Sequence, residues 1–334
     1  MFLIHPVYIQ PDMSRNGGSD SNIFIMRIQP QWTGIYPAVT TRYFPDESLD
    51  LSGFMKNIET QIETGVDGII VCGSLGENST LSSDEKILLL KSALHQAKGR
   101  VPVIICIAES RTNDAIYFCQ LAESAGADGL MILPPMRYAS DEVETMTYLV
   151  KVIKSTNLPV MIYNNPVAYG TLITIEMFRI LSDLPQVESM KESTGDIRFL
   201  TDLKNEFGNR FKILAGVDDL ALESLMMGAD GWVAGLVCAF PRETVAIYRL
   251  VRQGRWAEAL DIYRWFYPVL HLDVSARLVQ HIKMAETLTG MGNEYVRGPR
   301  MPLTGAARER VSAIILKALT TRPNLPPGSF GRKY

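Results

Sequence analysis

The segment Val187-Glu188-Ser189-Met190-Lys191-Glu192-Ser193-Thr194-Gly195 carries a lysine where a short apolar run meets a turn. Its length and composition predict a buried strand that ends near the lysine. Burial disfavours the charged form of an amine, so a lysine in this position can form a Schiff base with a carbonyl substrate. The ordinary alternative is a surface lysine that pairs with Glu188 or Glu192. We predict that Lys191 is an amine nucleophile.

A second segment, Pro159-Val160-Met161-Ile162-Tyr163-Asn164-Asn165-Pro166, has the same design, an apolar run that ends in a tyrosine and then a turn. A phenol beside an amine nucleophile can carry protons during catalysis. We therefore predict that Lys191 and Tyr163 are the catalytic pair and that the rest of the fold holds them together.

One unit recurs from Gly34 onward: an apolar run, a turn, an amphipathic segment, and a glycine or proline before the next run. Eight runs have strand character: 35–40, 68–72, 103–108, 129–133, 160–163, 187–191, 212–215 and 232–236. The segments between them repeat apolar residues with a helical period, as at Leu51, Phe54, Ile58 and Ile62. Eight alternating units predict an α/β fold, a (β/α)8 TIM barrel. An open doubly wound sheet is the alternative, but the chain lacks a nucleotide-binding glycine motif.

The sequence divides into four parts. Residues 1–31 mix Pro, Asn, Gly and Ser and predict a loosely ordered arm without the pattern of a signal peptide. Residues 32–252 form the predicted barrel, with its last helix at 240–251. Residues 253–323 predict a C-terminal helical appendage, with helices expected at 256–267, 274–289 and 305–319. Residues 324–334 form a tail rich in Pro and Gly that we expect to fray.

The composition excludes several classes of protein. The chain has 334 residues, of which 47% are hydrophobic and 21% charged, and its net charge is −3. It lacks the basic runs of nucleic-acid-binding proteins and the apolar runs of about 20 residues that span a membrane. Its four cysteines do not have the spacing of a metal site, and it has only four histidines. We expect no metal, no cofactor and a reducing, cytoplasmic location.

In a barrel of this kind the active site lies at the carboxyl ends of the strands. The loop Gly73-Ser74-Leu75-Gly76-Glu77-Asn78 can direct backbone N–H groups and the Ser74 hydroxyl toward a substrate carboxylate, or it can be a plain tight turn. Asp218 and Asp219 can accept hydrogen bonds from substrate hydroxyl groups or cap the following helix. Three further candidates follow the first and fourth strands: Thr40, Thr41 and Arg137. The arginine is either a carboxylate clamp or an exposed loop residue.

Three motifs together resemble the dihydrodipicolinate synthase / N-acetylneuraminate lyase superfamily: Gly73-Ser74-x-Gly76-Glu77, Tyr163-Asn164-x-Pro166 and Lys191-Glu192. The resemblance spans about residues 32–323 and implies a class I aldolase-type enzyme on a (β/α)8 barrel with extra C-terminal helices. It implies that Lys191 forms the Schiff base and that Tyr163 relays protons. It also implies that the 2-oxo acid carboxylate is held by Ser74 and the N–H of Leu75, and that Val233 approaches it from the eighth strand. Four residues would line the more variable end of the substrate: Ser193, Gly216, Asp218 and Asp219.

The chain departs from dihydrodipicolinate synthases at three places. Ala168 stands where they usually carry an arginine, Met136-Arg137 where they carry a tyrosine pair, and Leu75 where they carry a threonine. Without the arginine, the expected clamp for the carboxylate of aspartate semialdehyde is missing. This departure argues against condensation in lysine biosynthesis.

The finer sequence pattern is similar to that of 1-pyrroline-4-hydroxy-2-carboxylate deaminases of hydroxyproline breakdown: Tyr163-Asn164-Asn165-Pro166-x-Ala168-Tyr169, Ala215-Gly216-x-Asp218-Asp219, Arg264-Trp265-Phe266 and His271-Leu272-Asp273. We therefore predict a lyase that converts this cyclic imine to 2,5-dioxopentanoate and ammonia. The alternatives are 4-hydroxy-tetrahydrodipicolinate synthase, a pyruvate-releasing 2-oxo acid aldolase, and a non-catalytic ligand-binding barrel. The resemblance also implies a homo-oligomer, a dimer or tetramer, with a small 2-oxo acid or pyrroline carboxylate as its ligand.

Overall fold

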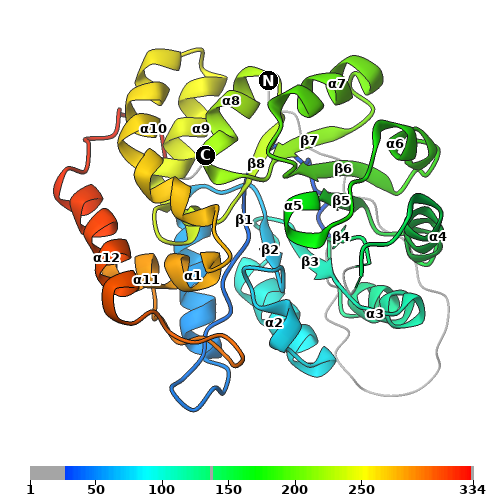
Figure 1. Cartoon of the computed structure of the whole chain (residues 1–334). Helices are drawn as coiled ribbons and strands as arrows, with labels where there is room; N and C mark the ends of the chain where they lie inside the picture. Colours follow the sequence, from blue (N-terminus) through cyan, green and yellow to red (C-terminus); the bar gives the residue numbers. More distant parts are fainter. Residues whose placement is uncertain (1–26, 136–137, 332–334) are drawn as a thin grey trace.

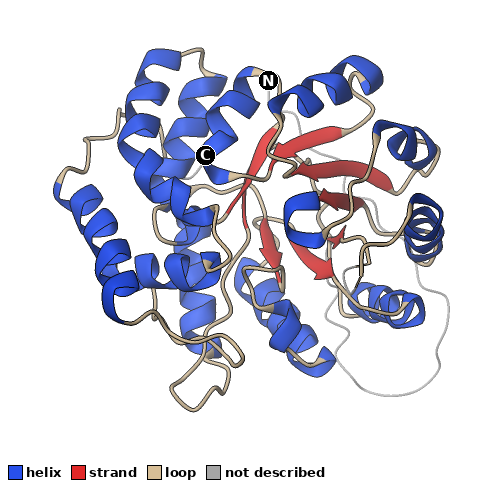
Figure 2. Cartoon of the chain, viewed as in Figure 1, coloured by secondary structure: helices blue, strands red, loops and turns tan. Residues whose placement is uncertain are grey.

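The computed structural model describes residues 27–135 and 138–331 and confirms the predicted barrel. Eight parallel strands follow one another around a nearly closed sheet in the order β1-β8-β7-β6-β5-β4-β3-β2 (Figures 1 and 2). The strands are β1 Gly34–Pro37, β2 Ile69–Val71, β3 Val103–Ile107, β4 Gly129–Ile132, β5 Val160–Asn164, β6 Val187–Glu192, β7 Lys212–Ala215 and β8 Gly231–Ala234. An isolated bridge between Ala38 and Ile70 joins the two ends of the sheet. All carboxyl ends of the strands therefore meet at one rim.

Helices surround the sheet, and the C-terminal helices extend it on one side. The barrel helices are α1 Leu51–Thr64, α2 Ser83–Ala97, α3 Thr112–Ser124, α4 Glu142–Ile153, α5 Pro166–Tyr169, α6 Ile175–Leu181, α7 Ile197–Phe207, α8 Ala221–Met226 and α9 Pro241–Arg252. The appendage contains α10 Trp256–Leu270, α11 Leu278–Leu288 and α12 Gly305–Thr320. It packs beside α9 and α1, on the left in Figure 1. Four 3₁₀ turns lie in the connections: η1 Asn78–Thr80, η2 Asp218–Leu220, η3 Leu236–Cys238 and η4 His271–Asp273.

The helix boundaries follow local chemistry. Ser82 caps α2 by accepting a hydrogen bond from the Glu85 N–H, and the Glu85 side chain accepts one from the Ser82 N–H in return. Helix α1 ends at Gly65, whose φ of 97° lies in the left-handed region that a residue with a side chain rarely adopts. None of the helices in the described part of the chain is long and apolar enough to cross a membrane.

Several predicted elements begin or end differently in the structure: the first strand stops at Pro37 instead of residue 40, and α10 continues to Leu270 instead of residue 267. Two further differences have a clear local cause. The eighth strand stops at Ala234 instead of residue 236, because the chain turns at once into η3. The helix expected over 274–289 begins only at Leu278, because η4 and the turn after it use the preceding residues. In both places the apolar pattern continues through a turn that lines the rim, so periodicity alone misses the boundary.

The expectation that the tail frays is wrong for its described residues. The Gly331 N–H donates to the Thr64 carbonyl at 2.8 Å, and Arg249 Nη2 donates to the Gly331 carbonyl at 2.6 Å. Ser329 is fully buried, and the Arg242 guanidinium lies 4.2 Å from the Phe330 ring centroid. The tail is thus held against the barrel by backbone hydrogen bonds and a cation–π contact.

The amino ends of the strands are closed by residues just before β1. The Ile28 N–H donates to Asp128 Oδ1 at 2.8 Å, and Trp32 Nε1 donates to Glu188 Oε2 at 2.8 Å. Trp32 is 1% exposed, and burial raises the pKa of Asp128 to about 6. The greater part of the predicted arm, residues 1–26, lies outside the described residues.

Candidate active site

Lys191 and Tyr163 lie side by side near the carboxyl ends of two adjacent strands. They are register partners in the parallel pair β5–β6, and Lys191 Nζ lies 4.1 Å from the centroid of the Tyr163 ring. Both side chains are buried, at 8% and 6% exposure. An ammonium over an aromatic face makes a favourable cation–π contact. The strand pairing therefore places an amine and a phenol next to each other at the rim where barrel enzymes have their active sites.

Gly216 and Ser193 occupy the next positions around Lys191. A Cβ atom on Gly216 would lie 2.7 Å from Lys191 Cγ and 2.0 Å from Ser193 Oγ, so a side chain at position 216 would displace both neighbours. The Gly216 N–H donates to the Glu192 carbonyl at 2.7 Å, which fixes this close approach. Ser193 is 3% exposed and its hydroxyl has no hydrogen-bond partner among the described residues. That hydroxyl is available to a bound molecule beside Lys191.

A second phenol, that of Tyr169, lies beside this group, although its motif in the sequence predicts no role for it. The hydroxyl groups of Tyr169 and Ser74 are hydrogen-bonded, and the Tyr169 ring meets the Tyr163 ring edge-on at 5.6 Å between centroids. Burial raises the pKa of Tyr169, and the nearby Tyr163 raises it further. Three side chains with hydroxyl groups therefore form a row in space that starts beside Lys191: Tyr163, then Tyr169, then Ser74.

The turn α5 brings Tyr169 to this position. Pro166 starts the turn, and Asn165 caps it by accepting a hydrogen bond from the Ala168 N–H at 3.0 Å. Asn165 Nδ2 also donates to the Tyr163 hydroxyl at 3.0 Å. The dipeptide Asn165-Pro166 is a sequence signal for a helix start, and one turn later stands Tyr169. This signal could have identified the second phenol.

The loop after β2 is anchored by a buried ion pair. Glu77 is fully buried, and its carboxylate accepts a hydrogen bond from Lys283 Nζ at 2.5 Å and lies 3.7 Å from Arg300. Ser74 and Leu75 therefore sit on a loop whose base is held by α11. Glu77 is recognisable in the sequence as part of this loop, but its partner is not, because Lys283 is 206 residues away.

The threonine candidates after β1 do not present their hydroxyl groups to Lys191. Thr40 donates to the Glu286 carboxylate at 3.0 Å, and Thr41 donates to the Gly76 carbonyl at 2.6 Å. Both are almost fully buried. The other rim candidate, Arg137, lies outside the described residues, as does its neighbour Met136.

The Asp218 carboxylate is hydrogen-bonded to the end of β8 and the turn that follows it. Its carboxylate accepts hydrogen bonds from Trp232 Nε1 at 2.9 Å, the Leu236 N–H at 2.7 Å and the Gly235 N–H at 3.1 Å, and the residue is 1% exposed. Burial raises its pKa, while these donors and Lys191 lower it. The side chain predicted to line the substrate is thus saturated by backbone and indole donors. Val233, predicted to approach the substrate acid, is 1% exposed within β8.

Three further polar side chains lie near Asp218: Asp219, His271 and Asp273. Asp219 Oδ2 and His271 Nδ1 are 2.6 Å apart. A Cβ atom on Gly235 would lie 3.0 Å from Asp273 Oδ1 and 3.5 Å from Asp218 Oδ2, so these two carboxyl groups approach the same point. Burial and the Asp218 charge raise the pKa of Asp273 to about 8, although Lys191 opposes the shift. His271 and Asp273 belong to a motif quoted from the sequence, but the motif alone predicts no role for them.

The described residues contain no group of three or more His, Cys, Asp or Glu side chains arranged to hold a metal ion. The four cysteines are buried and free, and burial raises the pKa of the Cys72 thiol to about 12. A thiol in such a state is a poor nucleophile. The nucleophilic candidate at this rim is therefore the amine.

Comparisons with known proteins identify the family and the fold of the chain. The model of the dihydrodipicolinate synthetase family matches residues 31–318. The chain is 32% identical to the 4-hydroxy-tetrahydrodipicolinate synthase of Salinibacter ruber, over 83% of this chain and 93% of that protein. It is 28% identical to that of Methanosphaerula palustris, over 84% and 96%.

Solved structures show the same architecture. A putative dihydrodipicolinate synthetase from Pseudomonas aeruginosa superposes with a TM-score of 0.81 at 29% identity, covering 86% of this chain and 99% of that one. The 4-hydroxy-tetrahydrodipicolinate synthase from Methylacidiphilum fumariolicum SolV gives a TM-score of 0.82 at 26% identity, covering 86% and 96%. Because the family model spans most of the sequence and its fold is reproduced throughout, the chain belongs to the dihydrodipicolinate synthetase family.

Proposed function

We propose that this protein is a Schiff-base-forming lyase that acts on a small 2-oxo acid or its cyclic imine. The observation that carries the proposal is the buried contact between Lys191 Nζ and the Tyr163 ring at the carboxyl rim of the barrel. Among the residues that the structure describes, no carboxylate forms an ion pair with Lys191. An amine without an ion-pair partner keeps its nitrogen available to a carbonyl carbon, where a lysine can form a Schiff base.

We further propose that the substrate is 1-pyrroline-4-hydroxy-2-carboxylate. Lys191 attacks C2 of the ring imine, the C2–N ring bond breaks, and a lysine imine with a free C5 amine remains. This imine accepts the electron pair when Tyr163 removes a C3 proton, and the C4 hydroxyl leaves as water. Proton shifts then move the unsaturation to the C5–N bond. Hydrolysis there releases ammonia, and hydrolysis of the lysine imine releases 2,5-dioxopentanoate. One water leaves and two enter, so the reaction consumes one water.

The polar groups near Lys191 support a substrate whose far end carries hydroxyl or amine groups. Asp219 and Asp273 place carboxyl groups at this rim, and Ala168 supplies no cation where a second substrate carboxylate would need one. The Asp219 carboxylate would repel a second substrate carboxylate, whereas a substrate hydroxyl or ammonium group could donate a hydrogen bond to it. Tyr169 and Ser74 would extend the proton path from Tyr163.

A second candidate activity is that of a 4-hydroxy-tetrahydrodipicolinate synthase, which is favoured by the names of the relatives. A direct comparison of substrates separates the two. We expect ammonia release from the hydroxylated pyrroline acid and little condensation of pyruvate with aspartate semialdehyde. The opposite result would assign the chain to the second activity, and pyruvate release from 4-hydroxy-2-oxo acids would indicate an aldolase.

The lysine assignment is tested without knowing the final substrate. Sodium borohydride added with pyruvate should reduce a Schiff base to a stable amine, and peptide mass mapping should find the label on Lys191. Modification of another lysine, with Lys191 unmodified, would refute the assignment. The matched control is Lys283, which is also buried but is paired with Glu77 and should remain unlabelled.

A further inference from the structure

The loop between β2 and η1, residues 72–77, has a conformation that its own sequence does not favour. Cys72 and Glu77 stand at its two ends with φ angles of 56° and 58°, in the left-handed region that residues with a side chain rarely adopt. Such a conformation costs free energy and persists only where contacts with the surrounding structure impose it. Ser74 and Leu75, the residues expected to bind the carboxylate of a 2-oxo acid, lie between these two ends.

The Glu77 side chain fixes one end of the loop with both of its carboxylate oxygens. Oε1 accepts a hydrogen bond from Lys283 Nζ at 2.5 Å, and Oε2 accepts one from the Arg297 N–H at 3.2 Å. The Arg300 guanidinium adds a positive charge 3.7 Å from Oε2. The side chains of Glu77 and Lys283 are both 0% exposed, so solvent and salt weaken their contact little. Three groups of the appendage therefore determine where Glu77 lies.

The backbone of Glu77 transmits this constraint to Ser74 and Leu75. The Glu77 N–H donates to the Ser74 carbonyl at 3.1 Å and closes a turn around Leu75 and Gly76. Ser74 is fixed again on its other side, because its hydroxyl group is hydrogen-bonded to that of Tyr169. The position of Glu77 thus sets the direction of the peptide N–H groups in this turn.

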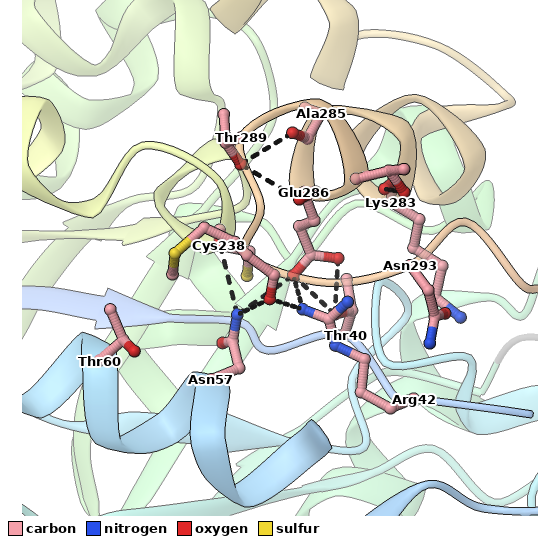
Figure 3. Close-up of polar contacts among 12 residues, drawn as sticks. Thr40, Arg42, Asn57, Thr60, Cys238, Lys283, Ala285, Glu286, Thr289 and Asn293 are labelled. Atoms are coloured by element: carbon pink, nitrogen blue, oxygen red, sulfur yellow. Dashed lines mark hydrogen bonds and ion pairs between the residues drawn. The ribbon is translucent and has the colours of Figure 1, made fainter.

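A second contact from α11 supports the neighbouring residue of the loop. Glu286, which lies one turn further along α11, accepts a hydrogen bond from Thr40 at 3.0 Å (Figure 3). The adjacent Thr41 donates to the Gly76 carbonyl at 2.6 Å. Helix α11 therefore reaches the loop directly through Glu77 and indirectly through the segment that follows β1.

We propose that Glu77 is a positioning residue for the substrate carboxylate: held by Lys283, it orients the loop that receives this carboxylate. The inference rests on the proposed lyase function, in which the loop binds a 2-oxo acid. Glu77 does not itself contact the reacting atoms, since its carboxylate is fully buried and both oxygens already accept hydrogen bonds from the appendage. The appendage thereby takes part in substrate binding without touching the substrate.

Borohydride trapping with two ketones tests this role. Pyruvate carries a carboxylate beside its ketone carbon, whereas acetone has a methyl group in that place, so only pyruvate uses the loop. The ratio of the two second-order rate constants for labelling of Lys191, pyruvate over acetone, measures how well the carboxylate is held. We expect Glu77→Gln to lower this ratio about tenfold, the effect of losing a well-oriented hydrogen bond to a charged group. Lys283→Arg, which keeps a cation opposite Glu77, should retain more of the ratio than Lys283→Met.

A double variant keeps the test valid if a single variant fails to fold. Glu77→Gln combined with Lys283→Met leaves no buried charge without its partner, so it should cost less stability than Lys283→Met alone. Its ratio should fall as in Glu77→Gln. Lys204→Met is the matched control, because it breaks the pair with Asp230 at 2.6 Å just before β8, at the amino side of the barrel. It should leave the ratio unchanged.

The two ways in which the experiment can fail are distinct. An equal ratio in the wild type and in the double variant would overturn the positioning role alone, and so would an equal fall in Lys204→Met. Absence of a pyruvate adduct on Lys191 in the wild type would overturn the lyase proposal and, with it, this inference.

Discussion

Two buried lysines, Lys191 and Lys283, stand in similar surroundings but have different partners. Each ammonium lies over a tyrosine ring, Lys191 at 4.1 Å from the centroid of Tyr163 and Lys283 at 4.6 Å from that of Tyr43. Lys283 also donates to the Glu77 carboxylate at 2.5 Å and to a backbone carbonyl at 2.6 Å. Burial lowers the pKa of Lys283, and Glu77 opposes that shift. In the described part of the molecule no carboxylate forms an ion pair with Lys191, although its charge lowers the pKa of Asp218 and of Asp273.

The difference shows how one side chain can serve two purposes in one fold. A lysine with a carboxylate and a carbonyl has its N–H groups used and its charge compensated, so it stabilises a junction. A lysine that rests on a phenol ring, with the unpaired Ser193 hydroxyl nearby, keeps its amine available for a carbonyl carbon. Burial therefore does not by itself identify a catalytic lysine. What distinguishes the two lysines is whether the ammonium group is paired with a carboxylate.

Lys191→Ala should have the largest effect on activity, because it removes the lysine that we assign to catalysis. Loss of a covalent nucleophile should reduce kcat by about 10³-fold or more. Folding should be retained, because the variant removes no ion pair. Turnover and urea unfolding are measured on the same preparation, with Lys283 as the internal control for borohydride labelling. Retained turnover in this variant would remove the amine from the mechanism.

Lys283→Met should instead lower stability, because it removes the lysine that we assign a structural role. Removing one partner of a buried ion pair leaves the Glu77 charge uncompensated and should lower the free energy of unfolding by about 3–5 kcal/mol. Urea unfolding measures the loss, and Lys91→Met, at an exposed position, should change it by less than about 0.5 kcal/mol. A stability equal to that of the wild type would contradict the role assigned to this pair.

Tyr163→Phe should separate proton transfer from imine formation at Lys191. The variant keeps the ring under Lys191 and removes the hydroxyl, so turnover should fall about 10²-fold while borohydride still traps the pyruvate adduct. Single-turnover kinetics and mass mapping give the two readouts. If trapping is lost together with turnover, Tyr163 is needed for the amine to react and not for the later proton transfers.

Tyr169→Phe should give a smaller effect at the same site. It removes the hydrogen bond to Ser74 but keeps the edge contact with Tyr163, so we expect kcat to fall about tenfold with little change in stability. Steady-state kinetics and thermal unfolding check this. An unchanged kcat would show that the proton path ends at Tyr163.

Asp273→Asn should have the smallest effect, visible only in the pH dependence. With its pKa raised to about 8, Asp273 is protonated below that pH and loses its proton above it. If the neutral carboxyl donates a hydrogen bond to substrate, kcat/KM should fall as pH rises through about 8, and the asparagine variant should lack this step. The measurement is a pH–rate profile from 6 to 10. Identical profiles for both proteins would exclude this role.

Much of the fold and the central pair were predictable because their signals are local. Strand runs show as short apolar segments, helices as a 3.6 period, and both catalytic candidates stand at the last residues of their runs. The saturation of Asp218 by Trp232, Gly235 and Leu236 was not predictable, because it depends on how β7 and β8 end in space. The same holds for the pair between Asp219 and His271, which joins the barrel to the appendage.

By itself the sequence determined the alternation of strands and helices and the reactive groups at the strand ends, since both follow from neighbouring residues. Only the tertiary structure decided which buried lysine meets a carboxylate. Glu77 and Lys283 are 206 residues apart, as Arg42 and Glu286 are 244 apart, and they meet only when the appendage packs against the closed barrel. Hydrophobic periodicity is a local property of the chain, whereas the pairing of buried charges depends on contacts between distant segments.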